Sequence, residues 1–294
     1  MGFAPPRRIW QRVNWSFLAR RFVAGETIES AIEAVRRINA QGMTASLDFL
    51  GEDVLDEATA AKTCDTYIAM LDAIRSSGVR SNVSVKLTAI GLLVDEDFAL
   101  GNLVRILERA QANPDPFVRI DMEGSALTER TLALFERAFA QHENVGVVLQ
   151  AYLKRTPGDV ERTIELGARV RLCKGAYNEP PQIAYRSMPE IRAQYRRLAE
   201  ALLVRGTYPG IATHDRRLIG AAKEITQRDG IAADRFEFQM LYGCRPSLQR
   251  SLAAEGYNLR VYVPFGTHWA GYFYRRVAER RENLLFALSS IFSR

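Results

Sequence analysis

The feature that most constrains this chain is an alternation of short β-rich runs with longer helical patterns, which begins at residue 43. Most runs are near-continuous apolar stretches, as expected of strands that are buried on both faces. Between them, apolar residues recur every three or four positions, which is the period of amphipathic helices. The expected strands are Met43–Leu50, Val83–Leu87, Phe117–Met122, Val145–Ala151, Val170–Lys174, Gly210–Thr213, Phe236–Leu241 and Leu259–Pro264, and the clearest helices are Ala58–Ser76, Phe98–Gln111, Leu127–Ala140 and Pro189–Arg205.

Eight such strand–helix units in roughly 250 residues predict an α/β fold, the (β/α)8 TIM-type barrel. The alternative is a doubly wound open sheet, which usually carries a glycine-rich turn after a strand. The sequence contains neither GxGxxG nor GxxxxGK[ST], so the barrel is favoured. We expect residues 1–40 to form an N-terminal helical arm, with one helix over Glu26–Ala40, and residues 41–294 to form the barrel.

Composition excludes several classes of protein. With 47% hydrophobic and 25% charged residues, the chain is neither disordered nor collagenous. Its three cysteines, Cys64, Cys173 and Cys244, show no CxxC spacing, which argues against a disulfide framework and a zinc ribbon. No apolar stretch approaches the ~20 residues of a membrane span, and no signal peptide is recognisable. A cytoplasmic location is therefore expected.

The net charge of +6 is concentrated near the N-terminus, ahead of the first acidic residue, Glu26. Because a nucleic-acid footprint would more often spread over a folded face, no nucleic-acid partner is expected. A basic amphipathic helix with tryptophan is typical of segments that lie on membranes. The alternative is a helix that packs its apolar side on the barrel, and the sequence leaves both open. The basic residues are Arg7, Arg8, Arg12, Arg20 and Arg21, and the apolar ones are Ile9, Trp10, Val13 and Phe17.

Polar residues end seven of the eight expected strands. In a barrel the chemistry lies at the C-terminal ends of the strands. A buried charge is costly unless it is paired or functional, so a convergent set of this kind predicts a site. The residues are Lys86, Asp121, Gln150, Arg171 with Lys174, Thr213 with His214, Gln239 and Tyr262.

The residue types in this set favour an organic cofactor over a metal. A metal at His214 would need two or three more ligands, and neither His142 nor His268 ends a strand, so no metal is expected. There is no GxSxG nucleophile motif either. The run Arg171–Tyr177 combines two cations, a glycine that allows close approach, and an aromatic face, which suits an anionic ligand with a ring.

A second cluster lies near the C-terminus. Glu279 follows Arg275 by four residues and Arg276 by three, so it can face both guanidinium groups on one helix. Two arginines held by a carboxylate can clamp the carboxylate of a ligand. A salt-bridged helix that faces solvent is the alternative.

Taken together, these motifs resemble the proline dehydrogenase family in its single-domain bacterial form, and the resemblance covers nearly the whole chain. The motifs are RFVAGE at 21–26, LDFLGE at 47–52, SVKLT at 84–88, RIDME at 119–123, QAYLKR at 150–155, RLCKGAY at 171–177, ATH at 212–214, EFQMLYG at 237–243, VPFG at 263–266, and Tyr272 with Arg275, Arg276, Glu279 and Asn283.

The resemblance implies FAD-dependent oxidation of L-proline to Δ1-pyrroline-5-carboxylate, with electrons passed to a membrane quinone. It also implies a distorted barrel whose last helix lies over the barrel mouth, a possible partnership with pyrroline-5-carboxylate dehydrogenase, and possible peripheral contact with the inner membrane face. Alternatives are a hydroxyproline dehydrogenase, a flavin barrel like methylenetetrahydrofolate reductase, and a basic adaptor without enzymatic activity. The double-arginine helix argues against a folate, and Tyr262 should crowd a 4-hydroxyl group.

The resemblance further implies a role for each matching residue. Lys86, Asp121 and Arg171 would be catalytic, with Asp121 paired to Lys86 and Arg171 near flavin N5. The substrate would be held by Lys86, Leu241, Tyr262, Arg275, Arg276 and Glu279. FAD would be held by Asp121, Met122, Gln150, Arg171, Lys174, Gly175, Ala176, Tyr177, Thr213, His214 and Gln239. The sequence departs from the family pattern at Asn178 and Asp215, near the expected adenosine end.

Overall fold

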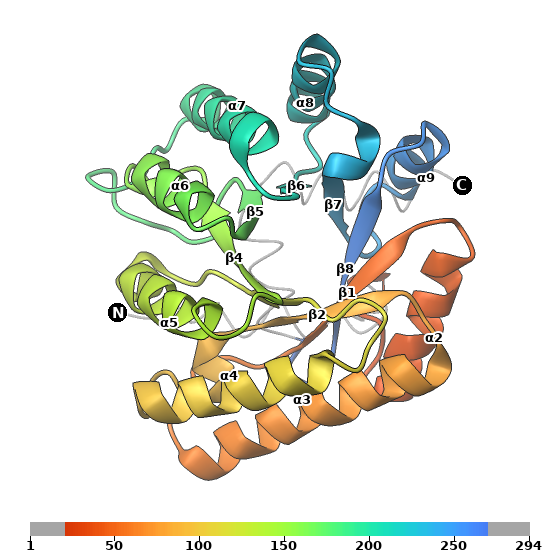
Figure 1. Cartoon of the computed structure of the whole chain (residues 1–294), viewed down its shortest axis with the longest axis vertical. Helices are drawn as coiled ribbons and strands as arrows, with labels where there is room; N and C mark the ends of the chain where they lie inside the picture. Colours follow the sequence, from red (N-terminus) through yellow and green to blue (C-terminus); the bar gives the residue numbers. More distant parts are fainter. Residues whose placement is uncertain (1–20, 270–294) are drawn as a thin grey trace, which may run out of the picture.

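Eight parallel strands close into a barrel in chain order, and β8 pairs with β1 to complete the ring (Figure 1). This computed structural model describes residues 21–269. The (β/α)8 fold is therefore confirmed. The strands are β1 (Thr44–Phe49), β2 (Ser81–Val85), β3 (Val118–Ile120), β4 (Val145–Gln150), β5 (Arg169–Cys173), β6 (Gly210–Ala212), β7 (Glu237–Leu241) and β8 (Leu259–Phe265).

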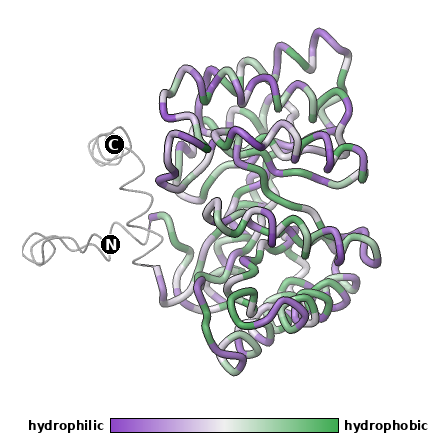
Figure 2. Tube along the Cα trace, turned by 90° about the vertical axis from the view of Figure 1, so that its left-hand side faces the viewer, coloured by the Kyte–Doolittle hydropathy of each residue, from purple (hydrophilic) through white to green (hydrophobic). Residues whose placement is uncertain are grey.

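Helices surround the barrel and lie within two residues of the four clearest sequence predictions (Figure 1). Green and purple alternate along many helical turns in Figure 2, as expected of helices with one face on the barrel. The helices are α2 (Ile28–Asn39), α3 (Glu57–Ser77), α4 (Glu96–Ala110), α5 (Thr128–Phe139), α6 (Thr156–Glu165), α7 (Met188–Arg205), α8 (Arg216–Arg228) and α9 (Pro246–Ala254), with 3-10 turns at Leu87–Ile90, Ser125–Leu127 and Ala233–Arg235.

Helix α2 belongs to the part of the chain expected as an N-terminal arm. A capping box between Thr27 and Ser30 starts it, so it is shorter than the predicted Glu26–Ala40. It packs against β1, β8 and α3, and it buries Ala31, Val35 and Ile38 in the main core. The basic segment 1–20 and the expected last helix, with Arg275, Arg276 and Glu279, lie outside the described residues.

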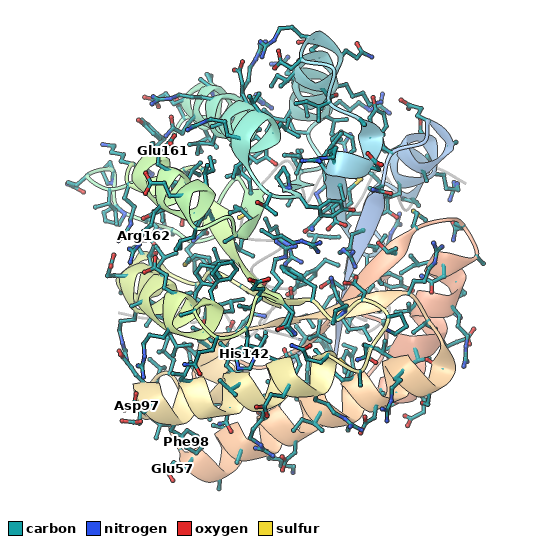
Figure 3. The ribbon with its side chains drawn as sticks, in the orientation of Figure 1. Glu57, Asp97, Phe98, His142, Glu161 and Arg162 are labelled. Carbon is teal, nitrogen blue, oxygen red and sulfur yellow. The ribbon has the colours of Figure 1, made fainter. Side chains whose placement is uncertain are left out.

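The inner face of the barrel is polar, which corrects the expectation that most strands are near-continuous apolar stretches buried on both faces. Arg171 on β5 donates to Ser84 Oγ on β2 at 3.0 Å, and these strands are not neighbours. Such a contact can only cross the interior. Side chains, several with nitrogen atoms, fill the middle of the barrel in Figure 3. The apolar residues alternate with these polar ones and face the helices, as Leu47 and Val83 do in the main core.

Charged side chains on the outer helices form ion pairs with side chains of neighbouring helices. Asp97, labelled on α4 in Figure 3, lies 2.5 Å from Arg137 on α5, and Glu161 on α6 lies 2.6 Å from Arg205 on α7. Exposed pairs of this kind contribute about 0–1 kcal/mol each to stability. Across residues 21–269, no helix combines the length and the apolar character that crossing a membrane requires.

Candidate active site

Lys86 lies between two carboxylates at the C-terminal end of the barrel. Its Nζ is 3.1 Å from both carboxylate oxygens of Asp48 and 3.8 Å from Asp121 Oδ2. The expected ion pair between Lys86 and Asp121 exists. The closer partner of Lys86, however, is Asp48 on β1, a residue that the sequence did not predict for the site. Burial by itself lowers the pKa of Lys86, but the charges of Asp48 and then Asp121 outweigh burial and raise it above its usual value. Lys86 is therefore a cation.

Asp121 accepts a hydrogen bond on each carboxylate oxygen. Arg171 Nη1 donates to Oδ1 at 2.9 Å, and the hydroxyl of Tyr262 donates to Oδ2 at 2.8 Å. The guanidinium of Arg171 also lies 5.2 Å from the centre of the Tyr262 ring. These contacts bring side chains of β5 and β8 to the carboxylate that follows β3. The three sequence-predicted residues therefore come together with Lys86.

Arg171 is buried, and one of its nitrogens has no hydrogen-bond partner within residues 21–269. Its Nε donates to Gln239 Oε1, and its Nη1 donates to both Ser84 and Asp121. Nη2 is buried and finds no hydrogen-bond partner among the described residues. An unsatisfied donor on a buried charge is costly, so this nitrogen is available for a bound group at the site.

Three of the predicted residues do not end their strands. Arg171 and Gln239 each lie two residues before the end of β5 and β7, and Tyr262 lies three residues before the end of β8. Their contacts with one another and with Asp121 lie inside the barrel rather than on the loops above it. The site is thus deeper than the sequence indicated.

Gln150 connects two loops above the barrel. Its Nε2 donates to the backbone oxygen of Glu123 after β3, and its Oε1 accepts from the backbone N–H of Ala176 after β5. The neighbouring Gly175 has φ +127°, and a Cβ there would lie 2.2 Å from the Tyr152 ring. Only glycine fits this close approach without strain. Gln150 and Gly175 therefore fix the path of the loop that the sequence predicted for the cofactor.

Lys174 and Asp215 form an ion pair beside this loop. Asp215 Oδ2 is 2.8 Å from Lys174 Nζ and 2.7 Å from Arg192 Nε, and its Oδ1 caps the start of α8. Burial raises the pKa of Asp215, but hydrogen bonds from Lys174 and Arg192 outweigh burial and hold it well below its usual value. The acid by which the sequence departs from the family pattern is therefore neutralised by two cations.

The remaining predicted residues lie around the same end of the barrel. The Thr213 hydroxyl accepts from the backbone N–H of Asp215, and His214 Nε2 accepts from that of Leu241. Met122 is buried, and Tyr177 is half-buried. Within residues 21–269, no three side chains of the types that bind metals come together in one group.

Together, these observations define a (β/α)8-barrel protein with a cluster of paired charges at the C-terminal ends of its strands, where the active sites of barrel enzymes lie. Residues 31–287 match the family described as Proline dehydrogenase. The chain belongs to this family.

Curated relatives agree with this assignment. Proline dehydrogenase 1 of Bacillus subtilis (strain 168) is 42% identical over 273 residues, which are 93% of this chain and 90% of that protein. Proline dehydrogenase of Deinococcus radiodurans is 41% identical over 279 residues, with 93% and 90% covered. Among solved structures, proline utilization A (PutA) from Bdellovibrio bacteriovorus, inactivated by N-propargylglycine, has a TM-score of 0.82 at 25% identity, over 91% of this chain and 33% of that one.

Proposed function

We propose that this protein oxidises L-proline to Δ1-pyrroline-5-carboxylate with FAD, as the first step of proline catabolism to glutamate, and passes the electrons to a membrane quinone. The observation that carries the proposal is Arg171, a buried cation tied to Asp121 and Gln239 with one donor nitrogen left over. Membership of the proline dehydrogenase family supports the choice of substrate.

The residues fit FAD as the bound group. Arg171 Nη2 can donate to a ring atom of the flavin, and Lys174 brings positive charge to the loop that Gly175 and Gln150 shape. Met122, Ala176, Tyr177, Thr213, His214 and Gln239 complete the proposed cofactor site. When bound, FAD supplies the hydride acceptor, and the protein supplies orientation and charge.

The substrate would lie beside Lys86. Because Lys86 is a cation, it does not serve as the base for the substrate amine. Leu241 and Tyr262 would contact the pyrrolidine ring. The proposed clamp for the substrate carboxylate, formed by Arg275, Arg276 and Glu279, lies outside the described residues and stays a prediction.

The proposed product would pass to a separate pyrroline-5-carboxylate dehydrogenase. The chain spans 24% of the Bifunctional protein PutA of Escherichia coli, at 28% identity over 322 residues. A cytoplasmic location with peripheral contact at the inner membrane face, through the basic residues of segment 1–20, fits a quinone acceptor and remains part of the proposal.

Anaerobic titration with substrate tests the proposed function. The purified protein should show flavin absorption bands, and L-proline should bleach them with formation of a cyclic imine that o-aminobenzaldehyde traps. trans-4-Hydroxyproline is the rival electron donor and should bleach the flavin far more slowly. Methylenetetrahydrofolate is a rival electron acceptor, so it is added to flavin already reduced by proline and should not restore the absorption bands. A colourless protein that takes up no FAD, faster bleaching by trans-4-hydroxyproline, or rapid reoxidation of the reduced flavin by methylenetetrahydrofolate would contradict the proposal.

A further inference from the structure

A chain of polar side chains, half-buried at Asp115 and buried from Arg260 onward, runs inside the barrel up to Arg171. Asp115, which precedes β3, lies 3.0 Å from Arg260 Nη1, and Arg260 Nε donates to both oxygens of Glu237 at 2.8 and 3.0 Å. Gln239 Nε2 then donates to Glu237 Oε1, and Arg171 Nε donates to Gln239 Oε1. The chain links β8, β7 and β5 to the site.

This chain fixes which end of the Gln239 amide faces Arg171. A carboxylate only accepts hydrogen bonds and a guanidinium only donates them, so Nε2 must face Glu237 and Oε1 must face Arg171. Burial raises the pKa of Glu237, but the charge of Arg260 and its hydrogen bonds outweigh burial and hold that pKa below its usual value. Glu237 is therefore ionised, and the amide has one favourable orientation.

The orientation of the amide sets the orientation of Arg171. Its guanidinium is planar and is held at two points, through Nε by Gln239 and through Nη1 by Asp121 and Ser84. These contacts define the plane of the group and hence the direction of Nη2. If the Gln239 amide were reversed, its NH2 group would face the Nε donor, and one of the two points would be lost.

We propose that Glu237 is a positioning residue for the oxidation, because it orients the Gln239 amide that holds Arg171 in place for the flavin. This inference rests on the proposed function and extends it to a residue below the site. Glu237 is 1% exposed. Among the residues that the structure describes, its hydrogen bonds come from Gln239, Arg260 and Tyr208, and none comes from Asp48, Lys86 or Asp121.

The variant Glu237→Gln tests this role. An amide at this position can donate or accept, so it no longer selects one orientation of Gln239. The rate of flavin reduction by proline should fall about tenfold, as expected for the loss of a hydrogen bond to a charged group. The Kd for proline should stay within about twofold, because the proposed carboxylate clamp is elsewhere. The visible circular dichroism of the bound flavin should change.

The double variant Glu237→Gln/Gln239→Glu is the matched rescue. The carboxylate at position 239 can accept from Arg171, and the amide at position 237 can donate to that carboxylate. Each hydrogen bond between Arg171 and position 237 then has one donor and one acceptor again, as in the wild-type protein. We expect the double variant to recover most of the wild-type rate. If Glu237→Gln does not fold, the double variant alone tests the proposal. A rate of flavin reduction in the double variant that is about tenfold or more below wild type would then overturn it.

Asp115→Asn is the control for stability. It removes a carboxylate from the same Arg260 but leaves Glu237 and Gln239 in contact. A lower Tm is expected, with wild-type flavin spectrum and reduction rate. A Glu237→Gln variant that folds and keeps the wild-type rate and spectrum would overturn the inference. Failure of the proposed function itself would show separately, as wild-type protein that proline does not bleach.

Discussion

At the scale of single residues, the site depends on how its charges are paired. Lys86 has Asp48 as a bidentate partner at 3.1 Å and Asp121 as a more distant one at 3.8 Å. Asp121 in turn is held by Arg171 and Tyr262. Asp48 therefore anchors the Lys86 cation, and Asp121 is shared between Lys86 and the groups across the barrel.

Double-mutant cycles measured by urea unfolding should show this difference. The coupling between Lys86→Met and Asp48→Asn should exceed that between Lys86→Met and Asp121→Asn by about 1 kcal/mol, since coupling energies between contacting charged residues range from about 0.5 to 3 kcal/mol. The Kd for FAD is measured for every variant, and the stabilisation by bound FAD is subtracted from each free energy of unfolding before the cycles are compared. Equal coupling in the two cycles, or stronger coupling with Asp121, would contradict this arrangement.

The residues missed from the sequence have a common physical reason. Reading only the strand ends leaves out Asp48, one residue before the end of β1, and the side chains deeper in the barrel, such as Glu237 and Arg260. A signal was present, because Glu237 and Gln239 alternate with apolar residues along β7, as Arg260 and Tyr262 do along β8. Which of these polar residues contact one another depends on barrel closure, which no local pattern contains.

At the scale of elements, the strands were predictable because their outward faces are apolar. The start of β2 was not, since it begins at Ser81 and not at Val83. Ser81 and Asn82 are polar but buried, and the residues from Leu87 form a 3-10 turn instead of extending the strand. The loop after β5 was recognised only through its motif, because its shape depends on contacts of Gly175 and Gln150 with distant backbone.

Gly175→Ala should impair this loop while leaving the barrel folded. The new Cβ would lie 2.2 Å from the Tyr152 ring at φ +127°, so the loop must move and FAD should bind much more weakly. Gly167→Ala is the matched control, since φ is +71° there but nothing lies within 4 Å. It should cost about 1 kcal/mol of stability and retain FAD. Fluorimetric FAD titration and urea unfolding measure both, and equal FAD affinity in the two variants would contradict this role.

At the scale of the whole molecule, the outward and inward faces of the barrel strands differ in role: the outward faces contribute to stability, and the inward faces carry the residues of the proposed site. The outward faces of the strands join the helices in the main apolar core. The inward faces hold charges, most of which are paired, as Arg260 is with Glu237 and Asp115. Arg119 differs, because its Nε and Nη1 have no hydrogen-bond partner within residues 21–269. Burial, followed by the charge of Arg171, lowers the pKa of Arg119 to about 9.

Two buried arginines in one barrel should therefore respond in opposite ways to the same substitution. Arg260→Met leaves Glu237 as an uncompensated buried charge and should lower the free energy of unfolding by about 3–5 kcal/mol. Arg119→Met removes a cation that gains no hydrogen bond at Nε or Nη1, so the free energy of unfolding should stay within about 1 kcal/mol or rise. Urea unfolding at neutral pH, with FAD saturating, measures both. Comparable destabilisation by the two variants would show that Arg119 balances the charge of Glu237 without a direct contact, and would contradict the division between paired and unpaired cations.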